Sequence, residues 1–163
     1  MNRKRIILTV LIILWAGTIF WFSSQIGSVS SSTSGRIVQK VINRFFPQMN
    51  IISPQGYQYF YTRVSFLVRK TAHYSEYLIL AVLLFSWFKA GRCGYILSAF
   101  LGWLLSTVYA WTDEFHQTFV SGRSPMLRDT VIDSAGALTG VIVMMILTAA
   151  FAYARGKSRR ELT

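Results

Sequence analysis

An uncharged apolar run near the start of the chain most constrains its fold. Residues 6–22 carry no charged side chain and follow three basic residues at 3–5. An α-helix rises about 1.5 Å per residue, so this run approaches the lower limit for crossing a bilayer core of roughly 30 Å. A signal peptide also has a basic start and an apolar run, but here no clean cleavage site follows and further apolar segments come later. We therefore predict a retained first transmembrane helix.

Three more apolar segments follow, at about 71–88, 94–112 and 129–153. Backbone polar groups cannot be left unpaired in lipid, so each segment is predicted to be a helix. Aromatic residues typical of membrane interfaces lie mostly near the predicted ends, at Trp21, Trp87, Trp103, Trp111 and Tyr153. The predicted fold class is all-α, a polytopic membrane protein with four transmembrane helices in a single domain over residues 1–163.

Composition agrees with a membrane protein. Hydrophobic residues make up 53% of the chain and charged residues 14%, against roughly 25% charged in soluble domains. The net charge of +11 raises the question of nucleic acid, but the bases cluster beside the apolar runs, so no nucleic-acid partner is predicted. The single cysteine, Cys93, excludes a disulfide scaffold and is expected to be an inert thiol in a reducing compartment.

The stretch between the first two spans has a pattern of its own. Residues 23–34 are rich in serine and are predicted to form a loop. Residues 35–46 place one apolar and one basic face on a helix, which predicts a helix in the membrane surface or, equally, a short helix capping the bundle. The apolar face holds Ile37, Val38, Val41, Ile42 and Phe45, and the polar face Arg36, Lys40, Asn43 and Arg44. Residues 57–68 are predicted to continue into the second span as one long helix.

The distribution of lysine and arginine orients the chain. With four spans both termini share one side, where short segments hold nine bases, against eight in the much longer segments of the other side. The density of bases in short loops marks the cytoplasmic side. Both termini are therefore predicted to be cytoplasmic, in a multi-pass protein of the cell membrane.

This orientation gathers the polar residues at the outer ends of the predicted spans. The set comprises Arg69, Lys70, His73 and Glu76 at the second span, Asp113, Glu114, His116 and Gln117 at the third, Arg123 and Arg128 in the loop, and Asp129 and Asp133 at the fourth. It contains both histidines and five of the six acids, the sixth being Glu161 in the basic tail. Charged groups within a membrane are costly, so their retention indicates a function or a satisfied polar network.

Helical spacing allows these groups to meet. Side chains three or four residues apart share a helix face, as at His73 with Glu76 and Tyr77, and at Asp113 with Gln117. Asp133 continues into small residues at Gly136 and Gly140 that permit close helix packing. We predict a polar pocket at the outer face. The alternative is a set of helix caps and ion pairs, which suits Asp129 best.

Three kinds of site chemistry fit this set of polar residues. A divalent metal is one, with His73, Glu76, Asp113 or Glu114, and His116 as ligands, although the spacing matches no standard zinc signature and no cofactor is predicted. A histidine–carboxylate pair acting as general base and acid is the second. An anion site built from Arg69, Lys70, Arg123 and Arg128 is the third, with a tight turn at 121–125 presenting Arg123.

At these residues the sequence resembles the VanZ-like family of bacterial membrane proteins. The resemblance rests on FSSQ at 22–25, RKTAHYSEYLIL at 69–80 and TDEFHQTFVSGRSPMLRDTVIDSAGALTG at 112–140. It implies a four-helix protein of the cell envelope, associated in some members with reduced sensitivity to teicoplanin-type glycopeptides. It supplies no catalytic residue for this chain.

The leading prediction is an envelope protein whose outward pocket binds an anionic, lipid-linked ligand, such as a pyrophosphate-bearing cell-wall precursor or a lipoglycopeptide. Arg123 and Lys70 are expected to bind the anion, around a centre of Glu76, Asp113 and His116 oriented by Gln117 and Asp133. One rival is a membrane-embedded hydrolase or transferase with His116 or His73 as base and Glu76 or Glu114 as acid. The other is a helical scaffold whose polar cluster only locks the helices together. Membrane lipids are the expected surroundings, and the pattern predicts no oligomeric state.

Overall fold

The protein is helical throughout the residues that the structure describes. A computed structural model describes residues 2–51, 53–123 and 127–160, with side-chain surroundings given except at 27–31, 33, 50, 51 and 156–160. Its elements are α1 (Arg3–Ser23), α2 (Gly27–Phe45), the 3-10 helix η1 (Pro47–Ile51), α3 (Pro54–Ala90), α4 (Tyr95–Gln117) and α5 (Leu127–Arg160). The prediction of an all-α chain is confirmed for these ranges.

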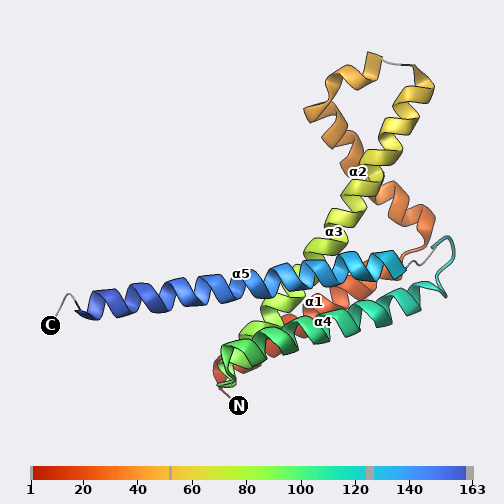
Figure 1. The fold of residues 1–163 in the computed structure, drawn as a ribbon. Coiled ribbons are helices and arrows are strands. Elements are labelled where there is room, and N and C mark those ends of the chain that lie inside the picture. Colours follow the sequence, from red (N-terminus) through yellow and green to blue (C-terminus); the bar gives the residue numbers. More distant parts are fainter. Residues whose placement is uncertain (1, 52, 124–126, 161–163) are drawn as a thin grey trace.

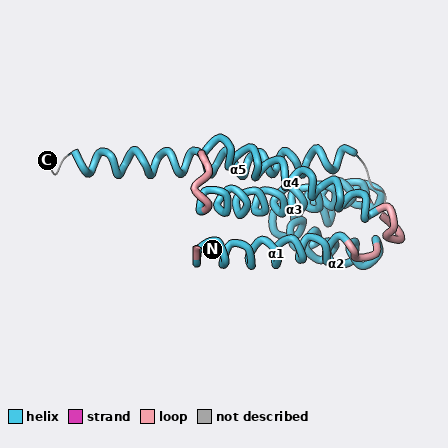
Figure 2. Tube along the Cα trace, turned by 90° about the horizontal axis from the view of Figure 1, so that it is seen from below, coloured by secondary structure: helices cyan, strands magenta, loops and turns pink. Residues whose placement is uncertain are grey.

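Four helical segments form the main bundle. α1, α4, α5 and the second half of α3 run side by side, and α5 continues past the bundle toward the C-terminus (Figures 1 and 2). The start of α1 and the α3–α4 turn lie at one end of the bundle. The α1–α2 junction and the α4–α5 connection lie at the other end.

Within the described ranges, three helices are long and apolar enough to cross a membrane. They are α1, α4 and the part of α5 up to Arg155. The second half of α3, which the sequence predicts as a span, is not among them, because its first turns carry polar side chains such as His73 and Glu76. The prediction of four spans therefore stays a prediction.

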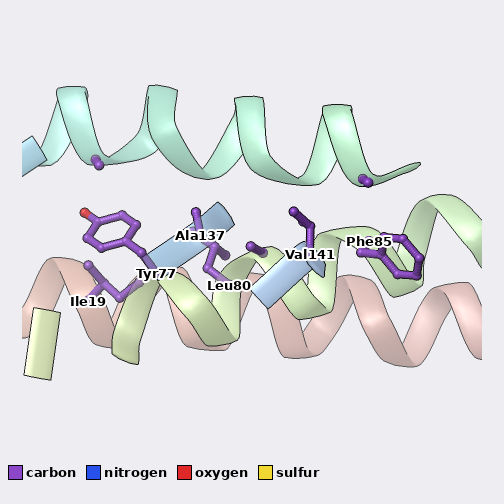
Figure 3. Packing of buried hydrophobic residues seen from close by; sticks show 9 residues of the cluster. Ile19, Tyr77, Leu80, Phe85, Ala137 and Val141 are labelled. Carbon is purple, nitrogen blue, oxygen red and sulfur yellow. The ribbon is translucent and has the colours of Figure 1, made fainter. Parts of the chain in front are cut away.

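The second half of α3 supplies the centre of the hydrophobic core. Tyr77, Leu80, Ala81 and Phe85 from this helix are at most 3% exposed. Around them pack Ile19 of α1, Ala99 and Ala110 of α4, and Ala137 and Val141 of α5 (Figure 3). Small residues on α4 and α5 let both helices approach α3 closely, so one helix organises the whole bundle.

The first half of α3 pairs with α2 in a hairpin that projects away from the bundle (Figure 1). Val38 and Ile42 of α2 are fully buried against Val64 of α3, and Tyr57 Oη donates a hydrogen bond of 2.9 Å to Gln39 Oε1. The hairpin thus has a small core of its own. α2 packs along α3 and does not cap the bundle.

The prediction of a loop over 23–34 is wrong. α1 continues to Ser23 and α2 begins at Gly27, so only residues 24–26 of this stretch lie outside a helix. Serine and glycine disfavour helices only weakly, and packing of the following turns against α3 outweighs that preference. The long third helix, in contrast, is confirmed: Ser53 Oγ accepts from Gly56 N at 3.2 Å, and Pro54 occupies the first turn, where its missing N–H costs nothing.

The approach of α5 to α3 depends on two glycines. A Cβ added at Gly140 would lie 2.5 Å from the carbonyl oxygen of Leu78, and one added at Gly136 would collide with the carbonyl group of Tyr74. Both positions are buried. The spacing of four residues keeps the two glycines on one face of α5, as predicted from the stripe of small residues.

Replacing Gly140→Ala should therefore destabilise the protein. The new methyl group would overpack the α3–α5 contact, and overpacking of this kind costs about 1–3 kcal/mol. We expect a lower melting temperature of the purified protein in detergent. Gly17→Ala is the matched control, because no atom lies within 4 Å of its added Cβ, and this variant should be neutral or slightly more stable. Equal melting temperatures for the two variants would contradict the account.

Candidate functional site

A pocket of about 210 Å³ opens beside the end of α1. Four parts of the chain form it: the end of α1, α2, the middle of α3 and the loop after α4. Its lining residues are Phe22, Gln25, Ser34, Ile37, Val68, Arg69, Ala72, His73, Glu76 and Arg123. The wall is largely apolar and the polar groups are few, which is the usual composition of a site for an organic ligand.

Arg123 connects the loop after α4 to the end of α1. Its Nη2 donates to the Phe22 carbonyl at 2.9 Å and its Nε to the Gln25 carbonyl at 3.2 Å. The carbonyls in the last turn of a helix lack partners within the helix, and a cation is favourable there. Gly122, with a φ of 75°, forms the turn before it. The other residues of the predicted turn, 124 and 125, lie outside the described residues.

Arg69 lines the same pocket as Arg123 and Glu76. Its side chain is exposed, and among the described residues no hydrogen bond or ion pair engages its guanidinium. Burial, and next the nearby Arg69, lower the pKa of the Arg123 guanidinium below its usual range, although the carboxylates of Asp113, Glu114 and Glu76 act in the opposite direction. Two guanidinium groups are thus close enough to repel each other at the edge of a partly apolar pocket, where an anion between them would be favoured.

Lys70, expected to share in anion binding, has a different neighbour. Its Nζ forms an ion pair with Asp129 Oδ1, which joins α3 to the first turn of α5. Arg128 is exposed, with its guanidinium 5.7 Å from the centre of the Phe66 ring. Of the four predicted anion ligands, the structure therefore brings only Arg69 and Arg123 together in the pocket.

A polar centre around two buried carboxylates lies inside the bundle. Asp113 of α4 and Asp133 of α5 are only 5% and 4% exposed, and Gln117 Nε2 donates to Asp113 Oδ2 at 3.2 Å. His73 Nδ1 lies 3.4 Å from Glu76 Oε2 at the pocket wall, a contact that is ionic when the imidazole is protonated and whose geometry falls short of a hydrogen bond. The spacings of three and four residues thus place these pairs together, as predicted.

His116 lies apart from this centre. Its Nε2 is 3.1 Å from Ser24 Oγ, and its ring packs on Phe20 with 4.6 Å between ring centres. Glu114 is partly exposed, within electrostatic range of Asp133 and Arg123. The divalent-metal hypothesis needs both histidines at one point, and the structure does not bring them together. Across the described ranges no three His, Cys, Asp or Glu side chains are arranged to hold a metal ion.

Two residues of the centre were not predicted as site residues. Ser23 and Tyr77 are 1% and 0% exposed, and both side chains interact with the Asp113 carboxylate. Tyr77 lies between α1 and α4 with its hydroxyl toward α4 (Figure 3). Tyr77 lies four residues after His73, which predicts that the two side chains share one face of the helix. Ser23 gave no signal, because the sequence pattern assigned it to a loop.

The chain belongs to the VanZ/LLP1 family. The family model of that description matches residues 8–148, which include the pocket, the polar centre, the whole of α4 and most of the candidate spans in α1 and α5. The resemblance drawn from the motifs is thereby confirmed. No curated protein and no solved structure matches the chain.

The contacts of Arg123 predict a structural effect of its replacement. Arg123→Gln should lower the free energy of unfolding by about 1.5–3 kcal/mol, the contribution typical of hydrogen bonds to a charged group. Arg92→Gln, in the exposed α3–α4 turn, removes the same charge without a described contact and serves as the control. Thermal unfolding in detergent measures both. A loss no larger than that of the control would show that the two carbonyl contacts contribute nothing.

Proposed function

We propose that this VanZ/LLP1 family protein is a multi-pass protein of the bacterial cell membrane whose outward pocket binds an anionic, lipid-linked envelope ligand. One observation carries the proposal: Arg69, which has no described partner, lies beside Arg123 in a pocket that also has an apolar wall of Phe22, Ile37, Val68 and Ala72. An arginine pair is suited to a phosphate or pyrophosphate, and the apolar wall to the first part of a lipid chain. A cell-wall precursor combines a pyrophosphate with a lipid chain, and a lipoglycopeptide combines a carboxylate, which arginine also binds, with an acyl chain.

In the proposed topology the second half of α3 is the fourth crossing segment. The three apolar helices pack around it, and the start of α1 and the α3–α4 turn lie at the same end of the bundle (Figure 1). Its polar first turns then lie near the outer interface, where charges cost less than at the membrane centre. Both termini are cytoplasmic in this arrangement.

The α2–α3 hairpin is proposed to lie on the outer membrane surface. The chain contains no acid before Glu76, whereas six lysines and arginines lie between residues 27 and 70. On α2, Ile37 and Phe45 are 51% and 69% exposed, next to an exposed basic stripe of Arg36, Lys40 and Arg44. A helix with neighbouring apolar and basic stripes is typical of binding to anionic lipid.

The anion-binding proposal predicts a specific loss of affinity. Arg69→Gln should weaken binding of farnesyl pyrophosphate to the purified protein about tenfold or more, because charge-assisted hydrogen bonds contribute about 1.5–3 kcal/mol. Titration calorimetry in detergent measures the affinity, and farnesol tests whether the lipid chain binds without the anion. Arg63→Gln, an exposed hairpin arginine whose guanidinium contacts Tyr59, is the matched control. Equal affinity in both variants would refute the anion site.

A hydrolase or transferase is the second candidate function. His73 and Glu76 line the same pocket, 3.4 Å apart, so a base and an acid are positioned beside the proposed phosphate site. Release of inorganic phosphate from farnesyl pyrophosphate, abolished in Glu76→Gln while binding is retained, would favour this candidate. Binding of farnesyl pyrophosphate without release of phosphate would favour the ligand-binding function.

A contribution to reduced sensitivity to teicoplanin-type glycopeptides is also proposed. It is supported by membership of the family and by the pocket's suitability for an acidic lipoglycopeptide. The scaffold alternative requires no ligand, and it would be favoured if farnesyl pyrophosphate and teicoplanin both failed to bind or to stabilise the folded protein.

A further inference from the structure

The polar centre inside the bundle contains several oxygen atoms without a hydrogen-bond partner. They are Ser23 Oγ, Tyr77 Oη, Asp113 Oδ1 and Asp133 Oδ1, on residues that are at most 5% exposed. Buried polar atoms are nearly always hydrogen-bonded, and leaving one unpaired costs about 1–3 kcal/mol. Four such atoms in one place indicate a site built for a ligand.

These oxygens come from all four packed helices and converge. The hydroxyl groups of Ser23 and Tyr77 interact with the Asp113 carboxylate, although neither forms a hydrogen bond of acceptable geometry. Asp133 lies within electrostatic range of both Asp113 and Tyr77. Figure 3 shows the Tyr77 side chain in the interior, with its hydroxyl directed toward the helix that carries Asp113.

The two buried carboxylates also lack a dedicated counter-ion. Lys70 is paired with Asp129, and Arg123 donates to the carbonyls at the end of α1. His73 faces Glu76, a third acid, and also lies within electrostatic range of Asp113 and Asp133, so one imidazole is shared among three carboxylates. Negative charge held away from water is unfavourable unless a positive charge accompanies it. The charge balance therefore favours a cation.

The donor set indicates which class of cation fits. Carboxylate and hydroxyl oxygens are hard ligands and suit hard ions better than transition metals. A divalent ion is expected to draw on more charged ligands, and in the ranges that the structure covers no three acidic, histidine or cysteine side chains form such a group. We propose that Asp113, Asp133, Ser23 and Tyr77 bind a small monovalent cation of the sodium type. This site is separate from the anion pocket and does not depend on the pocket's ligand.

Sodium-dependent stabilisation tests the site. A ligand that binds only the folded protein raises its melting temperature in a saturable way. The full chain in neutral detergent is unfolded thermally at constant ionic strength and pH while sodium chloride replaces choline chloride. We expect a saturable rise in melting temperature with sodium. An identical response to both salts would overturn the proposal. In a second series at fixed salt and varied pH, stabilisation by acid in a protein that shows no sodium response would also overturn it, because protons would then neutralise the carboxylates.

Variants connect that response to the named oxygens. Asp133→Asn should abolish the sodium response, and Tyr77→Phe, which removes only one hydroxyl, should raise the sodium concentration at half-effect about tenfold, the effect of about 1.4 kcal/mol. Asp129→Asn removes an acid from the same helix outside the site and should keep the response. If Asp133→Asn does not fold, the sodium response of Tyr77→Phe tests the assignment instead. An unchanged midpoint in Tyr77→Phe would overturn the assignment.

Discussion

The close contact between α3 and α5 is the constraint on which the rest of the molecule depends. Gly136 and Gly140 let α5 lie directly on the backbone of α3 at Tyr74 and Leu78. One turn before Gly136, the same contact brings Asp133 into electrostatic range of His73, and two turns before Gly136 it pairs Asp129 with Lys70. Because side chains cannot separate the two backbones here, the polar groups on either side are forced together. The close packing at Gly136 and Gly140 thus positions the polar side chains of the preceding turns of α5 against α3.

Long-range hydrogen bonds from aromatic side chains then enclose the polar centre. Trp15 Nε1 donates to the Glu76 carbonyl at 2.9 Å, and Tyr109 Oη donates to the Ala16 carbonyl at 2.8 Å. Both bonds attach α1 to the rest of the bundle near the level of Tyr77. Arg123 adds a third attachment at the end of α1. The centre is therefore shielded by α1, while the pocket remains open on the side of α2 and α3.

The sequence alone predicted the helical fold class, the family, the long third helix and the pairing of polar groups three or four residues apart. Each follows from local periodicity or from motif order. The course of residues 23–34 could not be predicted, because weak helix formers become helical there through contacts of later turns with α3. Nor could the separation of His116 from His73, since it depends on how α4 is rotated against Phe20 and Ser24. The sequence also could not show that Arg69, and not Lys70, is available to bind an anion, because this depends on the ion pair between Lys70 and Asp129.

The central claim is that the arginine pocket faces outward, and sidedness tests it most directly. In a Cys93→Ser background, a cysteine is placed either at exposed Ser121, in the loop next to Arg123, or at exposed Arg92, in the α3–α4 turn. Intact cells are then treated with a membrane-impermeant maleimide. The proposed topology predicts labelling of Ser121→Cys in intact cells and of Arg92→Cys only after permeabilisation. The reverse pattern would place the pocket on the cytoplasmic side and contradict an envelope ligand reached from outside.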